Sequence, residues 1–454
     1  MTALVWLRRD LRLGDNPAIT EAARDDDVVL LFVLDPRLWD RAGGARRAWL
    51  AASLRDLDEH TGGRLEIRVG DPARVVPARA CAHGATEVHV TGEVTPFGLR
   101  RDAAVARALA DASVDWRPWG TPYAVAPGTV LTGGGTPYKV FTPFARAWRE
   151  HGWPDPAPTV EPDRIVPGED DDRVASMLDA ALADAPEGMP AAGEDAAWQR
   201  WRRFRDDALD DYDTGRDRPD LDGTSRLSAY LRLGVLHPRS LLADLADRDD
   251  PGAERFVTEL AWREYHADVL WHEPGSAWRD LHPLGIDYDE HDPDDPTSGL
   301  AAWRSGTTGY PFVDAGMRQL LHEGWMHNRV RMVAASFLTK DLHAWWPVGA
   351  RHFLDHLVDG DVASNNHGWQ WVAGTGTDAS PYFRVFNPVT QGRRFDPDGA
   401  YVRRWVPELA HLPGVAAHEP WKHAGGYDHG YARPVVDHAE ARREALARWE
   451  GRAR

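Results

Sequence analysis

Strand-like and helix-like segments alternate over the first 120 residues, and this alternation restricts the fold more than any other feature of the chain. Each strand-like segment is short, apolar and rich in β-branched or aromatic residues, which is typical of a strand buried on both faces. The strand-like segments are residues 4–7, 28–34, 65–69, 87–92 and 114–119. Helical stretches such as residues 45–60 and 100–112 lie between them. The alternation predicts an α/β domain with a doubly wound parallel sheet.

No dinucleotide-binding motif follows the first predicted strand. A G-x-G-x-x-G run would hold a pyrophosphate at that position. The chain has RRDLRLGDNP there instead, at residues 8–17. We therefore do not expect this sheet to bind a dinucleotide in the usual way.

The composition changes after about residue 121, where proline, glycine and aspartate become frequent. Such a stretch is typical of a surface linker. One aromatic island within it, residues 136–148, is expected to pack against folded protein.

From Trp198 onward, strand signals nearly vanish and helical periodicity takes over. The predicted helices are residues 196–212, 226–247, 252–272, 313–322, 325–343 and 349–358. We therefore expect an α/β domain at residues 1–130, a linker at 131–195 and a large all-α domain at 196–454.

Apolar runs and cysteine usage exclude two classes of protein. The longest apolar run, Val28 to Leu34, is far shorter than the roughly 20 residues that span a membrane. The N-terminus meets a charge at Arg8 and lacks the pattern of a signal peptide. Cys81 is the single cysteine, so a disulfide framework and a cysteine-based metal cage are excluded. We expect a cytoplasmic protein that does not bind membranes.

The formal net charge of −18 argues against binding nucleic acid through bulk charge. It does not exclude a local basic groove, because the field at a surface depends on how charges are distributed. The chain also has 21 tryptophans, more than a core of this size requires. The additional tryptophans raise the question of a role in stacking or in electron transfer.

Residues 224–228, Thr-Ser-Arg-Leu-Ser, combine hydroxyl groups with an arginine at the predicted start of a helix. Backbone N–H groups and the helix dipole favour an anion at such a position. The ordinary alternative is that the hydroxyls only cap the helix. The segment alone fits either a phosphate site or a cap.

The predicted helix at residues 252–272 carries Glu259, Trp262, Arg263 and His266 within two turns. Glu259 and Arg263 are four residues apart and share one face, so a weak surface ion pair is the ordinary interpretation. The surrounding residues are apolar, however, and these charges are expected to be partly buried. A buried charge requires a partner or a functional role.

The predicted helix at residues 325–343 is a local positive surface in an acidic protein. It contains Asn328, Arg329 and Arg331, and no acidic residue lies between Glu323 and Asp341.

Residues 359–371 and 380–395 are further candidate binding segments. Asp359 and Asp361 begin the first, but no further ligands follow at the spacing of a calcium loop, so we expect no metal. The second interleaves aromatic residues with arginines. That combination suits nucleic acid with unstacked bases, and it equally suits a packed loop with solvated arginines.

Taken together, these segments resemble the photolyase/cryptochrome family. The matching segments are WLRRDLRLGDNPAI, TPYKVFTPF, TSRLS, ELAWREY, GYPFVDAGMRQL, GWMHNRVRM, DGDVASNNHGWQW and PYFRVFNPVTQGRRF. They occur in family order over essentially the whole chain, so the set is highly specific although each segment alone is modest. The likeness is greatest to class I cyclobutane pyrimidine dimer (CPD) photolyases.

The resemblance implies that the helical domain holds FAD. The residues implied to hold the phosphate and ribityl region are Tyr212, Thr224, Ser225, Arg226, Leu227, Ser228 and Arg263. Arg331 is implied to pair with Asp359 beside the flavin, and Asn328 is a further implied contact. Asp361 is implied to accept a hydrogen bond from N3–H, and Asn365 to face N5. A neutral amide there suits the reduced flavin anion, which a carboxylate would repel.

The resemblance also implies a lesion site. Glu259 and Asn328 are implied to hydrogen-bond the carbonyl groups of the dimer, an interaction that strengthens as charge develops on them. Trp262 and Trp371 are implied to stack on the flipped-out dimer, with Met332 lining the pocket. The residues implied to contact DNA phosphates are Arg216, Arg329, Arg384 and Gln391.

The implied activity is light-dependent DNA repair by a deoxyribodipyrimidine photolyase. Reduced FAD, excited by blue or near-UV light, gives an electron to the dimer, the cyclobutane ring splits, and the electron returns. The implied partner is UV-damaged DNA, with no obligate protein partner, and a monomer is the family expectation.

The alternatives are a cryptochrome-type photoreceptor and a DASH-type single-strand DNA photolyase. Asn365, Glu259 and the short chain after the helical domain favour repair over a photoreceptor. A (6-4) photolyase requires two histidines at the lesion, and Asn328 and Met332 stand in their places.

The chain departs from the family pattern in its tryptophan chain and its antenna. Trp369 and Trp346 match the first two members of the chain that photoreduces the flavin, but residues 286–299 lack the usual third. Tyr288 or Trp303 is the expected substitute. The acidic residue of folate-binding members is not apparent in residues 91–102, so we expect 8-hydroxy-5-deazaflavin as antenna, then an empty site, with folate disfavoured.

Overall fold

The computed structural model describes residues 2–169, 171–377 and 383–451. The chain forms two compact units. The first unit comprises Met1–Ala185, Pro190–Asp206 and Ser225–Pro274, and the second comprises Pro186–Met189, Asp207–Thr224 and Gly275–Arg454. The chain therefore passes between the units more than once.

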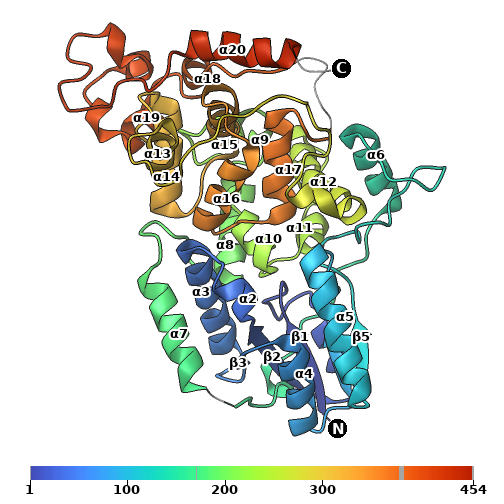
Figure 1. Ribbon diagram of the computed structural model, residues 1–454. Helices are drawn as coiled ribbons and strands as arrows, with labels where there is room; N and C mark the ends of the chain where they lie inside the picture. The colour runs from blue at the N-terminus through green and yellow to red at the C-terminus, as the bar shows by residue number, and fades with distance from the viewer. Residues whose placement is uncertain (1, 170, 378–382, 452–454) are drawn as a thin grey trace. The chain divides into compact units, whose positions relative to one another are not determined.

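A five-stranded parallel sheet forms the centre of the first unit (Figure 1). Its strands are β1 (Thr2–Leu7), β2 (Asp27–Leu34), β3 (Glu66–Val69), β4 (Glu87–Val90) and β5 (Asp115–Pro118). They lie in the order β3-β2-β1-β4-β5, and Leu4 of β1 pairs with Val29 of β2 and Val88 of β4. The predicted α/β fold with a doubly wound parallel sheet is confirmed.

The helices that follow the strands begin at strong local signals. They are α1 (Pro17–Ala22), α2 (Pro36–Trp39), α3 (Gly44–His60), α4 (Pro72–Ala82) and α5 (Pro96–Asp111). Four of them start with proline after a residue whose side chain caps the helix: Asn16, Asp35, Asp71 and Thr95. Proline fits the first helical position because its missing N–H would be unpaired there.

The stretch expected as a linker contains two packed helices, α6 (Phe141–His151) and α7 (Asp172–Ala183). Helix α7 buries Val174, Leu178 and Ala181 and packs on α3. Its apolar residues have helical spacing, but the surrounding prolines and aspartates made the composition typical of a linker. The aromatic island packs as predicted, with Phe144 and Trp148 buried on α6.

Helices α8 (Glu194–Asp207), α10 (Ser228–Leu233), α11 (Pro238–Asp244) and α12 (Pro251–His272) follow. Buried Glu264 ties α12 to α6. Its carboxylate accepts hydrogen bonds from the N–H groups of Ala124 and Val125 and from the indole of Trp148. These three bonds offset the cost of burying the carboxyl group, so the face of α12 that carries Glu264 is held firmly.

The second unit is helical, as expected. Its helices are α9 (Tyr212–Gly215), α13 (Gly299–Ser305), α14 (Pro311–Glu323), α15 (Asn328–Ser336), α16 (Trp346–His356), α17 (Val362–Ala373), α18 (Pro388–Phe395), α19 (Ala400–Trp405) and α20 (His438–Glu450). Short turns are η1 (Pro162–Arg164), η2 (Pro274–Ala277), η3 (Phe337–Asp341), η4 (Pro407–Leu409), η5 (Gly414–His418) and η6 (Pro420–Lys422). Aromatic residues such as Trp303, Phe337, Trp346 and Trp369 fill its core. Among the described residues, no helix is long and apolar enough to cross a bilayer.

Lys340 is buried on the π-helical turn η3. Its ammonium group donates to the backbone oxygen of Ala373, the last residue of α17, at 2.6 Å and lies 3.6 Å from the ring centroid of Phe383. Burial lowers the pKa of Lys340 from 10.5 to about 7, because desolvation disfavours the charged form. Between these values the unfolded chain binds more protons than the folded one, so stability rises with pH.

We expect Lys340→Met to remove this pH dependence. In the unchanged protein, the buried amine raises the free energy of unfolding by at most about 1.4 kcal/mol per pH unit between about pH 7 and pH 10. Urea unfolding across this range measures the slope, with the exposed Lys422→Met as control. If the free energy of unfolding changed with pH in the same way in the unchanged protein and in Lys340→Met, the lowered pKa of Lys340 would be contradicted.

Candidate active site

Arg331 and Asp359 form a partly buried ion pair between α15 and the turn before α17. Arg331 Nη2 lies 2.8 Å from Asp359 Oδ2, and Arg331 Nε donates to the backbone oxygen of Met326. The Asp359 side chain is only 3% exposed, and its Oδ1 is buried without a hydrogen-bond partner among the described residues. A buried oxygen in this state is costly. It therefore marks a place where a ligand that donates a hydrogen bond would be stabilised.

Polar groups continue along the first turns of α17. Asp361 caps the helix by accepting a backbone N–H at 3.0 Å. The amide nitrogen of Asn365 donates to the backbone oxygen of Ala350 at 3.1 Å and to Asn366 Oδ1 at 2.8 Å, which fixes the side chain. A methyl group added at Gly368 would meet no atom within 4 Å in the described part of the chain. Asn365 and Gly368 share a helix face, so open space adjoins the fixed amide.

The hydroxyl-rich segment forms a strained turn before α10 in the first unit. Arg226 has a φ of 53°, which is uncommon for a residue other than glycine. The N-cap residue of α10 is Leu227, whose side chain cannot accept a hydrogen bond, and the N–H of Leu227 donates to Ser225 Oγ at 3.4 Å. Ser225 Oγ thus accepts an N–H at the start of α10, and the segment still fits either a cap or a phosphate site.

Arg263 lies against the same helix. Its Nη1 donates to the backbone oxygen of Pro122 and its Nη2 to that of Leu231 in α10, both at 3.1 Å. The guanidinium also stacks 4.3 Å from the ring centroid of Tyr123. The structure thus brings Arg263 and α10 together, and a rigid cation lies beside the segment 225–228.

Glu259 takes part in the weak, partly exposed kind of ion pair that is ordinary on a helix face, with Arg255 as a partner. Glu259 Oε1 lies 2.6 Å from Arg255 Nη2, one turn back along α12. The Arg263 side chain turns to backbone oxygens instead. The partner at position 255 also satisfies the spacing of four, so sequence spacing alone could not select between the two arginines.

The indole of Trp262 is held flat by Phe141. The two rings are stacked, with centroids 3.6 Å apart and planes at 8°. Phe141 begins α6 in the aromatic island, and Tyr265 flanks both rings edge-on. Sequence reasoning missed Phe141 as a support for Trp262, although the aromatic composition of the island was the available signal.

Asn328 and Met332 lie one turn apart on α15, where Asn328 is exposed and Met332 is partly buried. Trp371 on α17 is also partly buried. The Arg384 guanidinium lies 5.6 Å from the ring centroid of Trp371, within reach of a cation–π contact. A predicted lesion residue and a predicted DNA contact therefore adjoin each other in the second unit.

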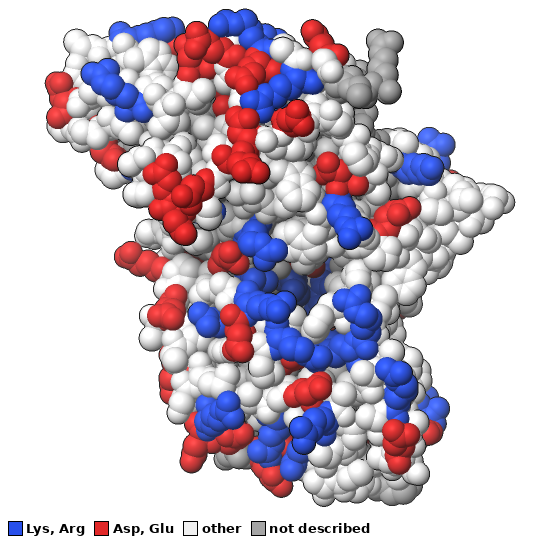
Figure 2. Space-filling view, in the orientation of Figure 1, with Lys and Arg blue, Asp and Glu red and all other residues white. Residues whose placement is uncertain are grey.

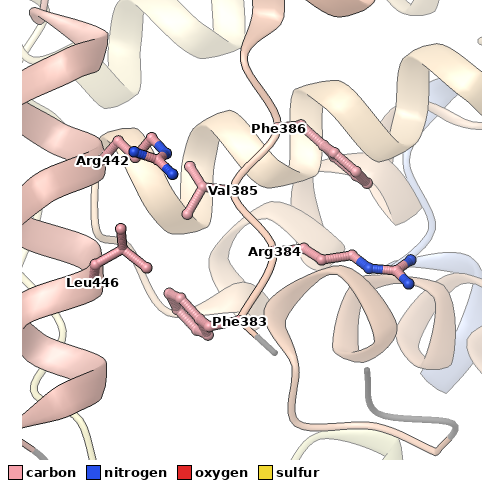
Figure 3. Close-up of a pocket in the computed structure, with 6 residues that line it drawn as sticks. All are labelled: Phe383, Arg384, Val385, Phe386, Arg442 and Leu446. Carbon is pink, nitrogen blue, oxygen red and sulfur yellow. The ribbon is translucent and has the colours of Figure 1, made fainter. Parts of the chain in front are cut away.

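Alternate residues of the segment 383–386 face opposite sides (Figure 3). Phe383 and Val385 point toward Arg442 and Leu446 of α20, whereas Arg384 and Phe386 point away. These six residues line an open pocket of about 420 Å³. Residues 380–382 of the predicted DNA-binding segment lie outside the described residues.

Arg329 is already engaged within the second unit. Its Nη2 lies 2.8 Å from Asp217 Oδ1, and its guanidinium lies 4.4 Å from the ring centroid of Phe395. Asp217 directly follows Arg216, the C-cap residue just after α9. Tyr212 is the buried first residue of α9, and Gln391 lies half-buried on α18.

Basic side chains gather into contiguous patches on the face shown in Figure 2, although acidic residues outnumber them in the sequence. A negative total charge therefore coexists with local positive surface, a combination that the net charge alone did not exclude.

Trp369 and Trp346 are both buried in the core of the second unit. The Trp346 indole donates to Asp280 Oδ1 at 2.7 Å, whereas Trp369 Nε1 has no hydrogen-bond partner among the described residues. Asp280 was not predicted as a functional residue, because nothing in its local sequence indicates two distant indoles as neighbours.

Comparison with known families matches both units. Residues 3–163 match the model of DNA photolyase, and residues 256–451 match that of the FAD binding domain of DNA photolyase. A deoxyribodipyrimidine photo-lyase of Streptomyces griseus is 44% identical over 97% of each chain. The Escherichia coli deoxyribodipyrimidine photo-lyase is 39% identical and covers 99% of this chain and 98% of its own.

Solved structures of photolyases and cryptochromes also resemble this chain. A class III photolyase from Agrobacterium tumefaciens superposes with a TM-score of 0.88 at 35% identity, covering 99% of this chain and 97% of its own. A Synechocystis cryptochrome superposes with a TM-score of 0.84 at 26% identity over 98% of each chain.

A parallel-sheet unit followed by a helical FAD-binding region defines the class of flavin-dependent light-responsive proteins. Within that class, the chain belongs to the photolyase/cryptochrome family.

The residues present fit FAD. Asp359 offers a buried acceptor without a partner, and Gly368 leaves space beside the fixed amide of Asn365. Arg263, which donates to α10, and the hydroxyl-rich segment before that helix suit a phosphate.

Proposed function

We propose that this chain is a light-dependent DNA repair lyase, a deoxyribodipyrimidine photolyase acting on UV-damaged DNA. The observation that carries the proposal is full-length identity of 44% to a relative that has this name. We assign cyclobutane pyrimidine dimers as the substrate because Asn328 and Met332 replace the histidine pair of (6-4) enzymes.

The finer assignment to class I rests on the whole set of matching segments. Residues 371–388, of which 378–382 lie outside the described residues, favour it over a DASH-type enzyme. A class III structure is also a near structural relative.

FAD, when bound in its reduced form, supplies an electron to the substrate on absorbing blue or near-UV light and takes it back after the ring splits. Thr224, Ser225, Ser228 and Arg263 hold its phosphate and ribityl groups. The other proposed contacts are Tyr212, Arg226, Leu227, Asn328, Arg331, Asp359 and Asp361. Asp359 and Asp361 accept hydrogen bonds from the cofactor, and Arg331 holds Asp359 in place at 2.8 Å.

Asn365 keeps the cofactor surroundings free of a further negative charge. We expect Asn365→Asp to lower the reduction potential of bound FAD by about 60 mV or more, because a carboxylate repels the added electron. A redox titration of the purified protein measures the potential, with the uncharged Asn365→Ser as control. An unchanged or higher potential in Asn365→Asp would rule out this role.

Glu259 and Asn328 orient the lesion by donating hydrogen bonds to its carbonyl oxygens. Glu259 can donate only when its carboxyl group is protonated, so it must leave its ion pair with Arg255 when the lesion binds. Trp262, held flat by Phe141, and Trp371, beside Arg384, stack on the flipped-out dimer, and Met332 lines the pocket. Stacking on aromatic rings contributes about 1–3 kcal/mol per base.

Arg216, Arg329, Arg384 and Gln391 contact the DNA backbone. Arg329 exchanges its contact with Asp217 for a phosphate when DNA binds, so part of the electrostatic gain is offset.

The antenna is proposed to be 8-hydroxy-5-deazaflavin. Glu93, the acidic residue in the segment after β4, is buried within 3.9 Å of Arg9 and 3.6 Å of Arg101. Its Oε1 also accepts the N–H groups of Val94 and Thr95. With its carboxylate occupied in this way, Glu93 does not serve a folate.

Binding in the dark tests the substrate assignment. The reduced, FAD-loaded protein is titrated with one duplex before and after UV irradiation, and with matched single strands. We expect at least about tenfold tighter binding to the irradiated duplex. Equal affinity for both duplexes would instead favour the cryptochrome alternative, which the Synechocystis neighbour represents. Preference for irradiated single strands alone would favour a DASH-type enzyme.

A further inference from the structure

Trp369 packs directly on the backbone of α16 at Gly349. A methyl group added at Gly349 would lie 2.1 Å from Cη2 of Trp369, so only glycine allows this approach. Gly349 is three residues after Trp346 and shares its helix face. Asn365 and Trp369 are four residues apart on α17 and also share a face. Trp369 thus reaches the helix that carries Trp346, one turn after that residue, and both indoles belong to the same buried core.

Trp345 extends this path to solvent. Its ring centroid lies 6.4 Å from that of Trp346, with planes at 65°, within the range of ordinary aromatic contact. Trp345 is 39% exposed, whereas Trp346 is fully buried. The two indoles thus connect the core of the second unit to its surface.

Asp280 binds both of these indoles. Its Oδ1 accepts Trp346 Nε1 at 2.7 Å and Trp345 Nε1 at 3.3 Å. A negative charge beside an indole stabilises the positive charge that forms when the ring loses an electron. The same carboxylate can accept the indole proton. Trp369 Nε1 has no such acceptor among the described residues. The tryptophan radical cation is therefore more stable at the Trp345–Trp346 pair than at Trp369.

The two substitutes expected from the sequence do not offer this combination. Trp303 contacts Trp369 at 6.1 Å between centroids, but it is completely buried and donates to the backbone oxygen of Ala334. The Tyr288 hydroxyl is buried without a hydrogen-bond partner among the described residues, and burial raises its pKa. Trp303 therefore lacks access to solvent, and Tyr288 lacks a base for its proton.

We propose that Trp345 is the surface terminus of the electron-transfer chain Trp369–Trp346–Trp345. Asp280 is the positioning residue that stabilises the tryptophan radical at this terminus. The proposal rests on FAD binding by this chain. FAD, when bound in its oxidised form and excited by light, would take one electron from Trp369; Trp346 would then give an electron to Trp369, and Trp345 to Trp346. Trp345 then releases its Nε1 proton to Asp280.

A small external thiol completes the balance. It returns one electron and one proton to Trp345, Asp280 releases to solvent the proton that it had accepted, and two such events join two thiols in a disulfide. Exposure of Trp345 allows this reaction to occur at the surface.

The test is transient absorption and steady-state photoreduction of the FAD-loaded, oxidised protein with excess thiol. We expect Trp345→Phe to lower the yield of the long-lived tryptophan radical and the rate of photoreduction at least about tenfold. Trp421→Phe removes an indole of similar exposure, 36%, and is the matched control. Trp303→Phe and Tyr288→Phe test the two alternative routes.

Asp280→Asn distinguishes electronic positioning from packing. It keeps the size of the side chain and removes its charge, so the radical at Trp345 should persist as the protonated cation, which has a different absorption spectrum. Dimer splitting after chemical reduction is measured on the same samples, so failed repair is separated from failed photoreduction. Unchanged photoreduction in Trp345→Phe, or loss in Trp303→Phe or Tyr288→Phe alone, would overturn the proposal.

Discussion

The Glu259→Ala/Asn328→Ala double variant is expected to split dimers at least about a thousandfold more slowly than the unchanged protein while it keeps its FAD. Each side chain donates to an oxygen that becomes more negative as the dimer gains an electron. Loss of one such donor costs about 2.7–4 kcal/mol in other enzymes that stabilise an oxyanion. The rate per absorbed photon, measured with chemically reduced protein, is the relevant quantity.

Two further variants make this prediction specific. Glu259→Gln keeps a hydrogen-bond donor at the same position and is expected to retain much more activity than Glu259→Ala. Glu254→Ala removes an exposed carboxyl group from the same helix and is the matched control. Splitting by the double variant within about tenfold of the unchanged protein would show that these donors do not act on the lesion.

Asp359→Ala is expected to lose FAD and about 3 kcal/mol of stability. The change leaves the partly buried guanidinium of Arg331 without its carboxylate, which is the costly way to break a buried ion pair. It also removes the buried oxygen that has no partner in the described chain. The FAD-to-protein ratio after purification and the urea midpoint of the apoprotein measure the two effects.

The double variant Arg331→Met/Asp359→Leu separates these effects. Apolar replacement of both partners is expected to restore most of the stability, but FAD remains absent because the acceptor is gone. Asp355→Ala, on α16, is the control. Full FAD content in Asp359→Ala would contradict the proposed cofactor site.

The parallel sheet could be predicted because each strand is a short apolar run bounded by helix signals. Proline after a capping residue sets where four of its helices begin. Helix α7 could not be predicted in the same way. Its apolar stripe is short and lies among aspartates and prolines, so local composition indicated a linker.

The candidate site was less accessible to sequence reasoning than the fold. Helix α17 carries most of the flavin-side residues, but glycine and asparagine weaken its helical signal. The partner of Glu259 depends on side-chain directions that spacing does not determine. The link from Trp345 and Trp346 to Asp280 spans more than 60 residues along the chain. Only tertiary packing brings such groups together.

Light-dependent repair is the most direct test of the assignment as a photolyase. Purified, reduced protein is mixed with UV-irradiated oligothymidine and kept in the dark or under blue light. A photolyase is expected to restore thymine absorbance in the light and not in the dark. The Glu259→Ala/Asn328→Ala variant is expected not to restore it. No recovery by a reduced protein that contains FAD would contradict the assignment as a photolyase and leave a photoreceptor as the better description.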